Sequence, residues 1–591
     1  MKKTSLISLL ANFWKHISIK RRFQLIGIVF LIILVSLVEI ISIGAVLPFL
    51  AVLTSPEKIE EIQFLQPVLS EFNFSNTTEL RLYITIFFTS VVIFSGIVRL
   101  ILIWAQTRFG YAVGADISIS CYRKILYLPY LTLISKNSSE FITGIINKTG
   151  MVVTQVVLPI LLIISTSIIL ISILTALLFV DSFVALVAGF GFLITYCLVI
   201  LTTKNRLIKH GTKISLKYNL LIQSLQEGLG GIRDVIIDGN QETYCKIFKE
   251  VDLPLRKAEA GITIIGQTPR FIVEALGISI LSIIAYYLSI RPDGISSAIP
   301  TLGVFALAAQ RLLPILQQIY QSWTSILGCS GVLEDILFYL NHKLPKHSNQ
   351  THIKSIKFNN SIELKNLCFS YSSKGHKIIE DFSCKINKGE RIGLIGETGS
   401  GKSTLIDLIM GLLIPQSGKI FIDNKQITKK NYRSWQLNIA HVPQNIFLSD
   451  TSIRENIAFG VSKEKIDDEL IYKCTKIAQI NDTIESWQDK YNTLVGERGV
   501  RLSGGQKQRI GIARALYKNS NVIIFDEATS ALDEHTESKV MDSIFDLDPN
   551  ITLIFISHRL STLKHCSQII ELKDGKVFRR GSFNEIIDNK K

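Results

Sequence analysis

The feature that most constrains this chain is a series of long apolar stretches in its first 330 residues. Each stretch holds roughly 20 or more nearly uncharged residues, which is the length that an α-helix needs to cross a bilayer. The stretches are 23–53, 82–107, 152–180, 183–203, 271–290 and 302–327. In a soluble protein, helices this apolar on all sides would form a large buried core, an alternative that their number and length disfavour. The sequence therefore predicts an all-α transmembrane domain of six helices over residues 1–340.

The distribution of charge predicts how these helices are oriented. The net charge is +15, but the basic residues lie in blocks beside the apolar stretches, as in cytoplasmic loops of membrane proteins, so no nucleic-acid partner is expected. The blocks precede the first stretch and fill the second and fourth connections, at Lys15, Lys20, Arg21, Arg22, Arg108, Arg123, Lys124, Lys204, Arg206, Lys209, Lys213 and Lys217. The first connection is acidic. We therefore expect both termini to lie in the cytoplasm.

Ionisable residues also fall inside the apolar stretches, at Glu39, Arg99, Arg270, Glu274 and Arg311. A charge at membrane depth costs about 2.5 to 3.5 kcal/mol on insertion scales, so it usually faces a cavity or a partner. One interpretation is structural, with snorkelling side chains or pairs such as Arg270 and Glu274, which are one helical turn apart. The other is a ring of the three arginines along a central pathway. Such a ring would suit an anionic headgroup, because guanidinium groups bind phosphate oxygens bidentately.

The sequence changes character after residue 340. Residues 341–360 are polar and aperiodic, contain Pro345 and predict a linker. Over 361–591, short apolar runs alternate with helical patterns, which predicts an α/β domain with mainly parallel strands. The eight cysteines show no CxxC pair and no grouping with histidine. We expect them to be reduced thiols that bind no metal.

A phosphate-binding loop follows the apolar run 391–395. It lies between that predicted strand and a helix predicted at 403–410, and it fits the P-loop pattern. In such a loop the glycine amides surround the phosphates, Lys402 reaches the β and γ phosphates, and the Ser403 hydroxyl is a ligand for Mg²⁺. The residues expected to bind ATP here are Gly396, Glu397, Thr398, Gly399, Ser400, Gly401, Lys402, Ser403 and Thr404.

Two carboxylates end the apolar run 522–525. Asp526 is expected to hold the Mg²⁺ shell, and Glu527 to act as the general base that polarises the attacking water. An acidic pair after a strand is weak evidence alone, but together with a P-loop it predicts a nucleotide hydrolase. His558 follows the apolar run 552–556, and in this context we expect it to contact the γ-phosphate and the water.

The segment Leu502-Ser503-Gly504-Gly505-Gln506, before a helix predicted near Lys507, separates this chain from other P-loop proteins. It resembles the signature of the ABC transporter superfamily. Other positions are similar to the family's adenine-stacking aromatic residue (Tyr371), Q-loop (Gln444), pre-signature segment (496–499), D-loop (530–533) and switch histidine (His558). The resemblance implies that Tyr371, Ser503, Gly504, Gly505, Gln506 and Asp533 contact ATP, that Gln444 contacts Mg²⁺, and that Gln444, Glu527 and His558 are catalytic.

With one P-loop, one signature and six stretches, the chain resembles an exporter-type half-transporter. The resemblance implies an ABC exporter transmembrane domain followed by an α/β P-loop nucleotide-binding domain, in a bacterial inner membrane. It also implies a second half-transporter as partner, since one subunit's signature completes the other's ATP site. We expect an identical chain, with a heterodimer as the alternative. ATP binding would then switch the helices from inward-facing to outward-facing, through coupling helices at 127–140 and 220–238 that dock near Gln444.

Within the exporters, the membrane half is most similar to the lipid-linked oligosaccharide flippases, at 38–49, 268–270 and 311–314. That resemblance implies that Arg99, Arg270 and Arg311 face the cavity and attract a pyrophosphate. We therefore expect ATP-driven flipping of a lipid-linked oligosaccharide or another anionic glycolipid. The alternatives are an exporter of hydrophobic drugs or lipid A-like lipids and an exporter of peptides. The glycosylation sequon at Asn76 is expected to be unused.

Overall fold

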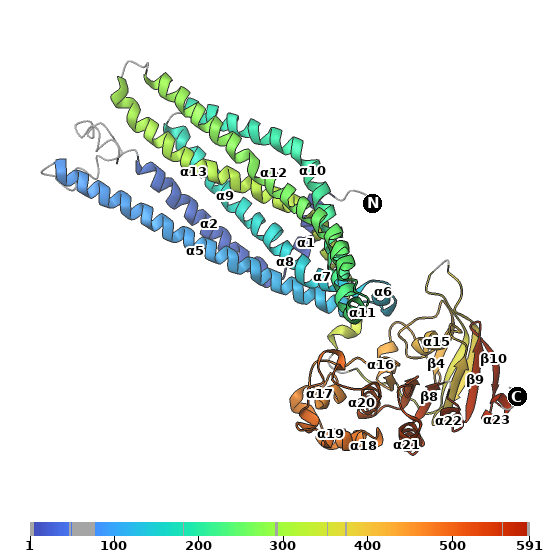
Figure 1. The fold of residues 1–591 in the computed structure, drawn as a ribbon. Coiled ribbons are helices and arrows are strands. Elements are labelled where there is room, and N and C mark those ends of the chain that lie inside the picture. The colour runs from blue at the N-terminus through green and yellow to red at the C-terminus, as the bar shows by residue number, and fades with distance from the viewer. Residues whose placement is uncertain are drawn as a thin grey trace. The chain divides into compact units, whose positions relative to one another are not determined.

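The computed structural model describes residues 5–46, 49, 77–180, 182–289, 294–350, 353–372, 375–557 and 559–587. The chain divides into two compact units. The first comprises Met1–Leu128 and Lys136–Leu344, and the second comprises Pro129–Ser135 and Pro345–Lys591. Figure 1 shows the first unit as a bundle of long helices and the second as strands flanked by shorter helices. The sequon at Asn76 lies outside the described residues.

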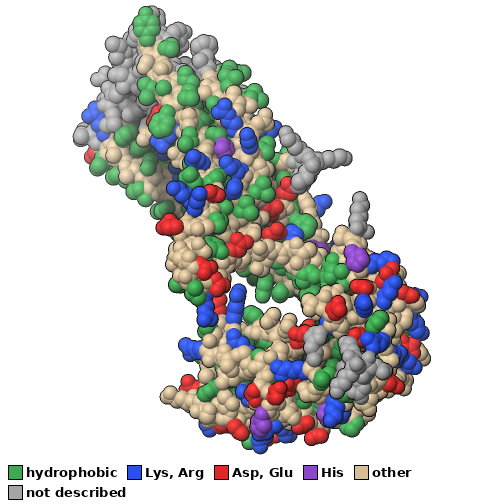
Figure 2. Space-filling view, turned by 45° about the vertical axis from the view of Figure 1, so that its right-hand side comes forward, with side chains coloured by type: hydrophobic (Ala, Val, Ile, Leu, Met, Phe, Trp, Pro, Cys, Tyr) green, Lys and Arg blue, Asp and Glu red, His purple; other side chains and the backbone are tan. Residues whose placement is uncertain are grey.

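The described part of the first unit is helical. Its helices are α1 (Leu6–Lys15), α2 (Ile19–Gly44), α5 (Thr77–Leu126), α7 (Ser138–Thr143), η2 (Gly144–Lys148), α8 (Thr149–Val152), η3 (Val153–Val157), α9 (Leu158–Val180), α10 (Ser182–Gly230), α11 (Ile232–Ile237), α12 (Gln241–Ser289), α13 (Gly294–Gly328) and α14 (Ser330–Leu340). Hydrophobic side chains are spread over this unit in Figure 2, with Lys and Arg among them. An apolar exterior of this kind suits lipid as the surroundings.

The predicted stretches lie on six long helical segments of this unit. Within the described residues, three segments are long and apolar enough to cross a membrane: Ile19–Ser42, Arg81–Leu126 and Ser138–Leu178. The other three stretches fall on α10, α12 and α13. Two prolines inside α12, Pro254 and Pro269, do not end it, as is common in membrane helices, where neighbouring groups satisfy the freed carbonyls. The predicted stretch 23–53 continues beyond α2 and ends outside the described residues.

Backbone contact and a partly buried ion pair hold helices of this unit together. Gly211 on α10 approaches α13 so closely that a Cβ on it would lie 2.1 Å from the carbonyl oxygen of Gly328. Small residues allow such approaches between helices in a membrane protein. Elsewhere, the ammonium of Lys148 lies 2.5 Å from a carboxylate oxygen of Asp335 on α14, and the Ser215 hydroxyl donates to the same oxygen. Lys148 is buried.

The second unit contains two sheets. Their strands are β1 (Ser361–Phe369), β2 (Ile379–Asn387), β3 (Arg391–Gly396), β4 (Ser417–Ile422), β5 (Lys425–Gln426), β6 (Ile439–Val442), β7 (Val522–Asp526), β8 (Thr552–Ile556), β9 (Gln568–Lys573) and β10 (Lys576–Gly581). The smaller sheet is antiparallel, in the order β2-β1-β4-β5. The larger has the order β10-β9-β3-β8-β7-β6 and is parallel except at β10.

Short helices surround these strands. They are η4 (Lys346–Asn349), α15 (Lys402–Ile409), α16 (Tyr432–Gln436), α17 (Ile453–Ile457), η5 (Lys463–Lys465), α18 (Asp468–Ile477), α19 (Asn481–Glu485), η6 (Lys490–Asn492), η7 (Glu497–Gly499), α20 (Gly504–Tyr517), α21 (Glu534–Phe545), α22 (Leu560–Leu563) and α23 (Phe583–Ile587). Every residue of β8 is buried, and so are the first four of β7, because both faces of a parallel sheet are covered. The α/β architecture predicted for this part of the chain is therefore present.

One helix from the membrane half of the sequence belongs to the second unit. This helix, α6 (Tyr130–Ile134), lies within the predicted coupling segment 127–140. We expected that segment to dock near Gln444. In the structure Tyr130 packs against a core that includes residues of β1, β2, β3 and α15. Burial raises the pKa of its hydroxyl, and the charge of Asp407 adds to this effect. Docking of the predicted segment near Gln444 stays a prediction.

Candidate functional site

The P-loop lies between a buried strand and a helix. It leaves β3 at Gly396 and enters α15 at Lys402. Gly396 and Gly401 have φ angles of 146° and 101°, values that residues with a side chain rarely adopt. A Cβ on Gly396 would also lie 2.3 Å from the carbonyl oxygen of Leu572. The turn of this loop therefore depends on glycine at both positions.

Lys402 folds back over this loop. Its Nζ donates hydrogen bonds to the carbonyl oxygens of Gly396 and Glu397, at 2.6 and 2.9 Å. Burial lowers the pKa of Lys402, while the nearby charges of Glu527 and Asp526 act in the opposite direction. An ammonium group held at the turn of a P-loop is positioned to bind phosphate oxygens.

Hydroxyl groups complete the loop. The Ser400 hydroxyl is buried and has no hydrogen-bond partner among the described residues. Ser403, by contrast, is exposed at the first turn of α15. Thr404 is buried, and its hydroxyl lies 3.1 Å from that of Tyr371. Unpaired buried polar groups usually mark a place where a ligand or water completes the site.

The predicted carboxylates and Gln444 meet where two neighbouring strands end. β6 and β7 are parallel neighbours, so the residues that follow them lie at the same edge of the sheet. The Gln444 amide nitrogen donates to a carboxylate oxygen of Glu527 at 2.7 Å. Glu527 has a φ of 48°, a left-handed conformation that costs about 1 to 2 kcal/mol for a non-glycine residue. Backbone strain of this kind is common at functional sites.

Asp526 lies beside Glu527 at the end of β7. Burial raises the pKa of Asp526, and the charge of Glu527 adds to this effect, while Lys402 opposes it. Asp407 on α15 is a further carboxylate near Asp526, and burial, with the charge of Asp526, raises the pKa of Asp407 to about 6. A cation would stabilise these crowded carboxylates in their charged forms.

Tyr371 follows β1 and lies beside α15. Its ring packs edge-on against Phe369, with ring centroids 5.1 Å apart. Its side chain is 44% exposed, so one part of the ring is available to a ligand. A half-exposed aromatic ring beside a P-loop helix can stack on a purine base.

The signature segment begins a helix. Ser503 is the N-cap of α20, and its hydroxyl accepts from the backbone N–H of Gln506, whose side chain accepts from the N–H of Ser503. This capping box starts the helix at Gly504, three residues before the predicted start near Lys507. The signature residues bond one another rather than the P-loop of the same chain. The helix N-terminus they form is a positive end that favours anions.

The turn at 530–533 is held by residues that the sequence did not single out. The Gln508 amide donates to the Ser530 hydroxyl at 3.0 Å and accepts from the Ala531 N–H at 2.9 Å. Arg559 donates to the Ser530 carbonyl and forms an ion pair with Glu537. No local pattern marks Gln508 or Arg559, because their partners are distant in sequence.

Asp533 and His558 were also predicted to belong to the ATP site. Asp533 is the N-cap of α21 and accepts from the N–H of Thr536 at 2.9 Å. His558 lies outside the described residues. The carboxylates and the P-loop are thus brought together by β3 and β7, while Asp533 caps a helix elsewhere in the unit.

Comparison with known proteins identifies the family. Residues 379–530 match the model of the ABC transporter family. Over 398 residues the chain is 30% identical to the ATP-dependent lipid A-core flippase of Francisella novicida, covering 66% of this chain and 65% of that protein. Residues 379–530 form a domain of the ABC transporter family. The chain therefore contains an ATP-binding domain.

The chain is also similar to a translocation protein and to a solved exporter structure. The α-hemolysin translocation ATP-binding protein HlyB of Escherichia coli O157:H7 is 37% identical over 284 residues, which are 48% of this chain and 40% of that protein. The matched segments span just under two thirds of the flippase and less than half of HlyB. The fold is similar to that of a bacterial Atm1-family ABC exporter with ATP bound, with a TM-score of 0.79 and 20% identity over 96% of both chains. The ABC exporter fold, a unit of long apolar helices followed by an α/β domain, is therefore confirmed.

The long apolar helices of the first unit hold an ion cluster. Glu39 on α2 is fully buried and accepts from Arg99 on α5 and Arg311 on α13. The structure thus brings together two of the three predicted cavity arginines. Arg270 lies 3.9 Å from Glu274, one turn further along α12. Because the Arg270 side chain is 63% exposed, this second pair contributes little stability.

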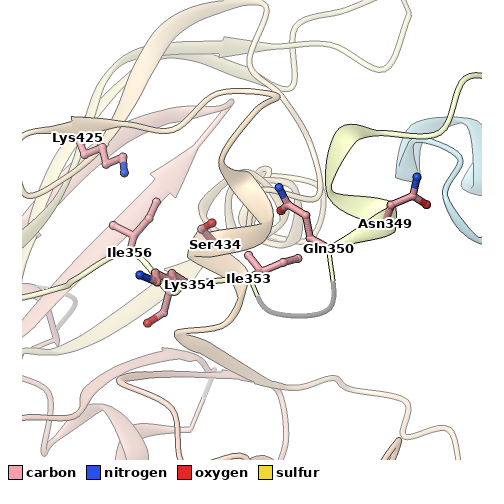
Figure 3. A pocket seen from close by; sticks show the side chains of 8 residues that line it. Asn349, Gln350, Ile353, Lys354, Ile356, Lys425 and Ser434 are labelled. Carbon is pink, nitrogen blue, oxygen red and sulfur yellow. The ribbon is translucent and has the colours of Figure 1, made fainter.

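Two hollows are lined by residues other than those of these clusters. In the first unit, an apolar pocket of about 620 Å³ is lined by α9, α10 and α13, with Tyr196, Tyr320 and Trp323 among its residues. In the second unit, an open pocket of about 610 Å³ is lined largely by residues of the predicted linker, and its lining includes Lys354 and Lys425. Figure 3 shows the two lysines on separate segments of this hollow, with Asn349 pointing away. No predicted ATP residue lines either pocket.

Proposed function

We propose that this chain is half of a dimeric, ATP-driven exporter that moves an anionic lipid, such as a lipid-linked oligosaccharide, across the membrane by alternating access. The observation that carries the cargo class is the ion cluster inside the membrane helices. Its two arginines, Arg99 and Arg311, share the single carboxylate of Glu39. A surplus of positive charge at membrane depth is expensive and usually serves an anion or a relay.

In this proposal the P-loop binds the ATP phosphates through its amides and Lys402, and Tyr371 stacks on adenine. Ser403, Gln444 and Asp526 would hold Mg²⁺, which neutralises charge developing on the phosphates. The donor set fits: Ser403 is exposed, and the Asp526 carboxylate lies among other acidic groups.

Glu527 is the proposed general base. The hydrogen bond from Gln444 orients its carboxylate, and the strained backbone fixes its direction. A positioned carboxylate of this kind can accept the proton of an attacking water. His558 would contact the γ-phosphate.

The second half of each ATP site is proposed to come from a second copy of this chain. Ser503, Gly504, Gly505 and Gln506 would supply donors from the N-terminus of α20, and Asp533 would approach from the D-loop. ATP would bind the closed dimer more tightly than the open one, and that difference in affinity would drive the membrane helices outward. Both termini would lie in the cytoplasm, in a bacterial inner membrane.

A second candidate is an exporter of hydrophobic drugs, lipid A-like lipids or peptides. The apolar pocket between α9, α10 and α13 favours it, because none of the described residues that line that pocket is charged. A lipid carries both an anionic headgroup and a hydrocarbon chain, and it would therefore use both features. The ion cluster remains the observation that favours an anionic lipid.

The test is ATP-dependent movement of a fluorescent lipid-pyrophosphate oligosaccharide across proteoliposomes that contain the purified chain. We expect movement with the wild type and none with Glu527→Gln, which should lose hydrolysis by a factor of about 100 or more while it still binds ATP. Glu464→Gln, the same change at an exposed glutamate, is the matched control and should behave as the wild type. Intact ATP hydrolysis without lipid movement would refute the cargo class, and hydrolysis retained by Glu527→Gln would refute its role as base.

A further inference from the structure

The carboxylate of Glu39 is the centre of a network that joins three membrane helices. One of its oxygens, Oε1, accepts from both Arg99 and Arg311. The other, Oε2, accepts from the Ser95 hydroxyl at 2.8 Å. Arg311 also donates to the Ser42 hydroxyl, at 3.3 Å. Both carboxylate oxygens of Glu39 therefore accept hydrogen bonds from residues of its own chain.

The charges of this network do not balance. Two guanidinium groups face one carboxylate, which leaves one positive charge in excess. The Glu39 side chain is 0% exposed, whereas Arg99 and Arg311 are 41% and 28% exposed. The carboxylate thus lies behind the arginines, and the cations are the part that a ligand can reach.

The arginines also retain hydrogen-bonding capacity. A guanidinium group has five N–H donors in a fixed fork. Arg99 contacts Glu39 through a single nitrogen, and Arg311 uses one nitrogen on Glu39 and another on Ser42. One carboxylate oxygen shared by two arginines is a poor match for two forks, whereas a phosphate group offers several oxygens and binds each fork bidentately.

We infer that Glu39 is a resident counter-ion with which the phosphate of an incoming headgroup competes for Arg99 and Arg311. Glu39 keeps the two arginines together in the empty site and takes them back when the anion leaves. This inference rests on the proposed anionic cargo and adds the residue that sets how tightly the anion is held and how readily it is released. A purely structural tie between α2, α5 and α13 would not need exposed cations, and such buried ion pairs seldom add net stability.

One substitution of a polar residue in this network is expected to strengthen anion binding rather than weaken it. Glu39→Gln keeps the size and one acceptor of the side chain but removes the competing charge. We expect it to bind a diphosphate about tenfold more tightly than the wild type, the size of a typical coupling between two ligands. Release should then slow, so that both KM and kcat for the transported lipid fall. A variant that had merely lost structure would bind more weakly.

The experiment measures equilibrium binding of radiolabelled farnesyl diphosphate to the purified full-length chain in detergent, with inorganic pyrophosphate as a competitor. Arg99→Gln and Arg311→Gln should weaken binding. Glu39→Asp, which keeps the charge but draws it back by one methylene, should tighten binding less than Glu39→Gln does. Ser279→Ala is the control, because its hydroxyl donates only to the Ala275 carbonyl of its own helix α12 at 2.8 Å and lies outside the Glu39 network; it is expected to bind as the wild type. Thermal unfolding and ATP binding confirm that each variant is folded.

The outcomes separate the inference from the proposed function. If the wild type binds farnesyl diphosphate but neither Glu39 variant binds it more tightly, the counter-ion role is wrong and the anionic cargo stands. If the Glu39 variants bind inorganic pyrophosphate as tightly as farnesyl diphosphate, the site takes a free anion and the lipid source is wrong. If no variant binds either anion, both the counter-ion role and the anionic cargo are refuted.

Discussion

Replacing Gly211 by alanine tests whether α10 and α13 are held in backbone contact. The added Cβ would lie 2.1 Å from the carbonyl oxygen of Gly328, whereas an ordinary contact begins at 3.4 Å. The shortfall is 3.4 − 2.1 = 1.3 Å. Because the obstacle is backbone, no rotation of a side chain relieves it, and the two helices must move apart.

The size of the effect follows from two opposing terms. Overpacking a close contact costs about 1 to 3 kcal/mol, and alanine recovers up to about 1 kcal/mol through its better helix propensity. We therefore expect Gly211→Ala to destabilise the first unit by about 1 to 2 kcal/mol, and to lower its unfolding temperature by about 1 to 3 °C, since the shift per kcal/mol falls as a unit becomes longer.

Two other glycines provide a graded comparison. A Cβ on Gly328 would meet only the side chain of Ile262, at 2.7 Å, which can shift, and a Cβ on Gly96 of α5 would meet nothing within 4 Å. The assay is the temperature at which purified protein in detergent loses its monodisperse peak. The expected order of unfolding temperatures is Gly211→Ala below Gly328→Ala below Gly96→Ala. Equal temperatures for Gly211→Ala and Gly96→Ala would show that α10 and α13 are not in backbone contact.

Three further predictions concern buried polar groups. Burial lowers the pKa of His441 from 6.5 to about 4, and its Nε2 has no hydrogen-bond partner among the described residues. Below pH 6.5 the unfolded chain binds a proton at this position, whereas the folded chain does so only near pH 4. The free energy of unfolding should therefore fall by about 2 kcal/mol between pH 7.5 and pH 5. His441→Gln should flatten this dependence in thermal unfolding scans at the two pH values, and an unchanged slope would contradict it. Asp335→Asn removes the negative charge that faces the buried Lys148, and because the Asp335 side chain is itself 40% exposed, the loss should be about 1 to 2 kcal/mol. Adding Lys148→Met should restore most of that loss, and additive losses would argue against a coupled pair. Trp435→Phe removes the hydrogen bond from the fully buried indole to the Ile409 carbonyl, 2.8 Å long, and should lower the free energy of unfolding by about 1 to 3 kcal/mol without changing ATP affinity.

Much of the second unit could be predicted because its signals are local. The apolar run 552–556 is a strand with the predicted bounds, and the strands predicted at 391–395 and 522–525 each extend one residue further. The P-loop needs glycines at fixed positions, so its place between strand and helix is visible in the sequence. α20 begins three residues before its predicted start, because Ser503 and Gln506 form a capping box that starts the helix at Gly504.

Contacts across long sequence distances could not be predicted in the same way. Glu39 is 60 residues from Arg99 and 272 from Arg311, and the sequence showed only that all three lie in apolar stretches. Arg270, of the same residue type and in a similar stretch, pairs with Glu274 instead. Which arginines share a carboxylate depends on how the helices pack, and hydrophobicity alone does not specify that packing.

The sequence by itself determined that this chain has a membrane-spanning helical half and an ATP-binding α/β half, because span length, strand periodicity and phosphate-loop glycines are local properties. Only the tertiary structure decided that Gln444 reaches Glu527, that α6 rests on the core of the second unit, and that Glu39 neutralises one of two arginines. These contacts join residues from different elements, and they form only when packing brings the elements together.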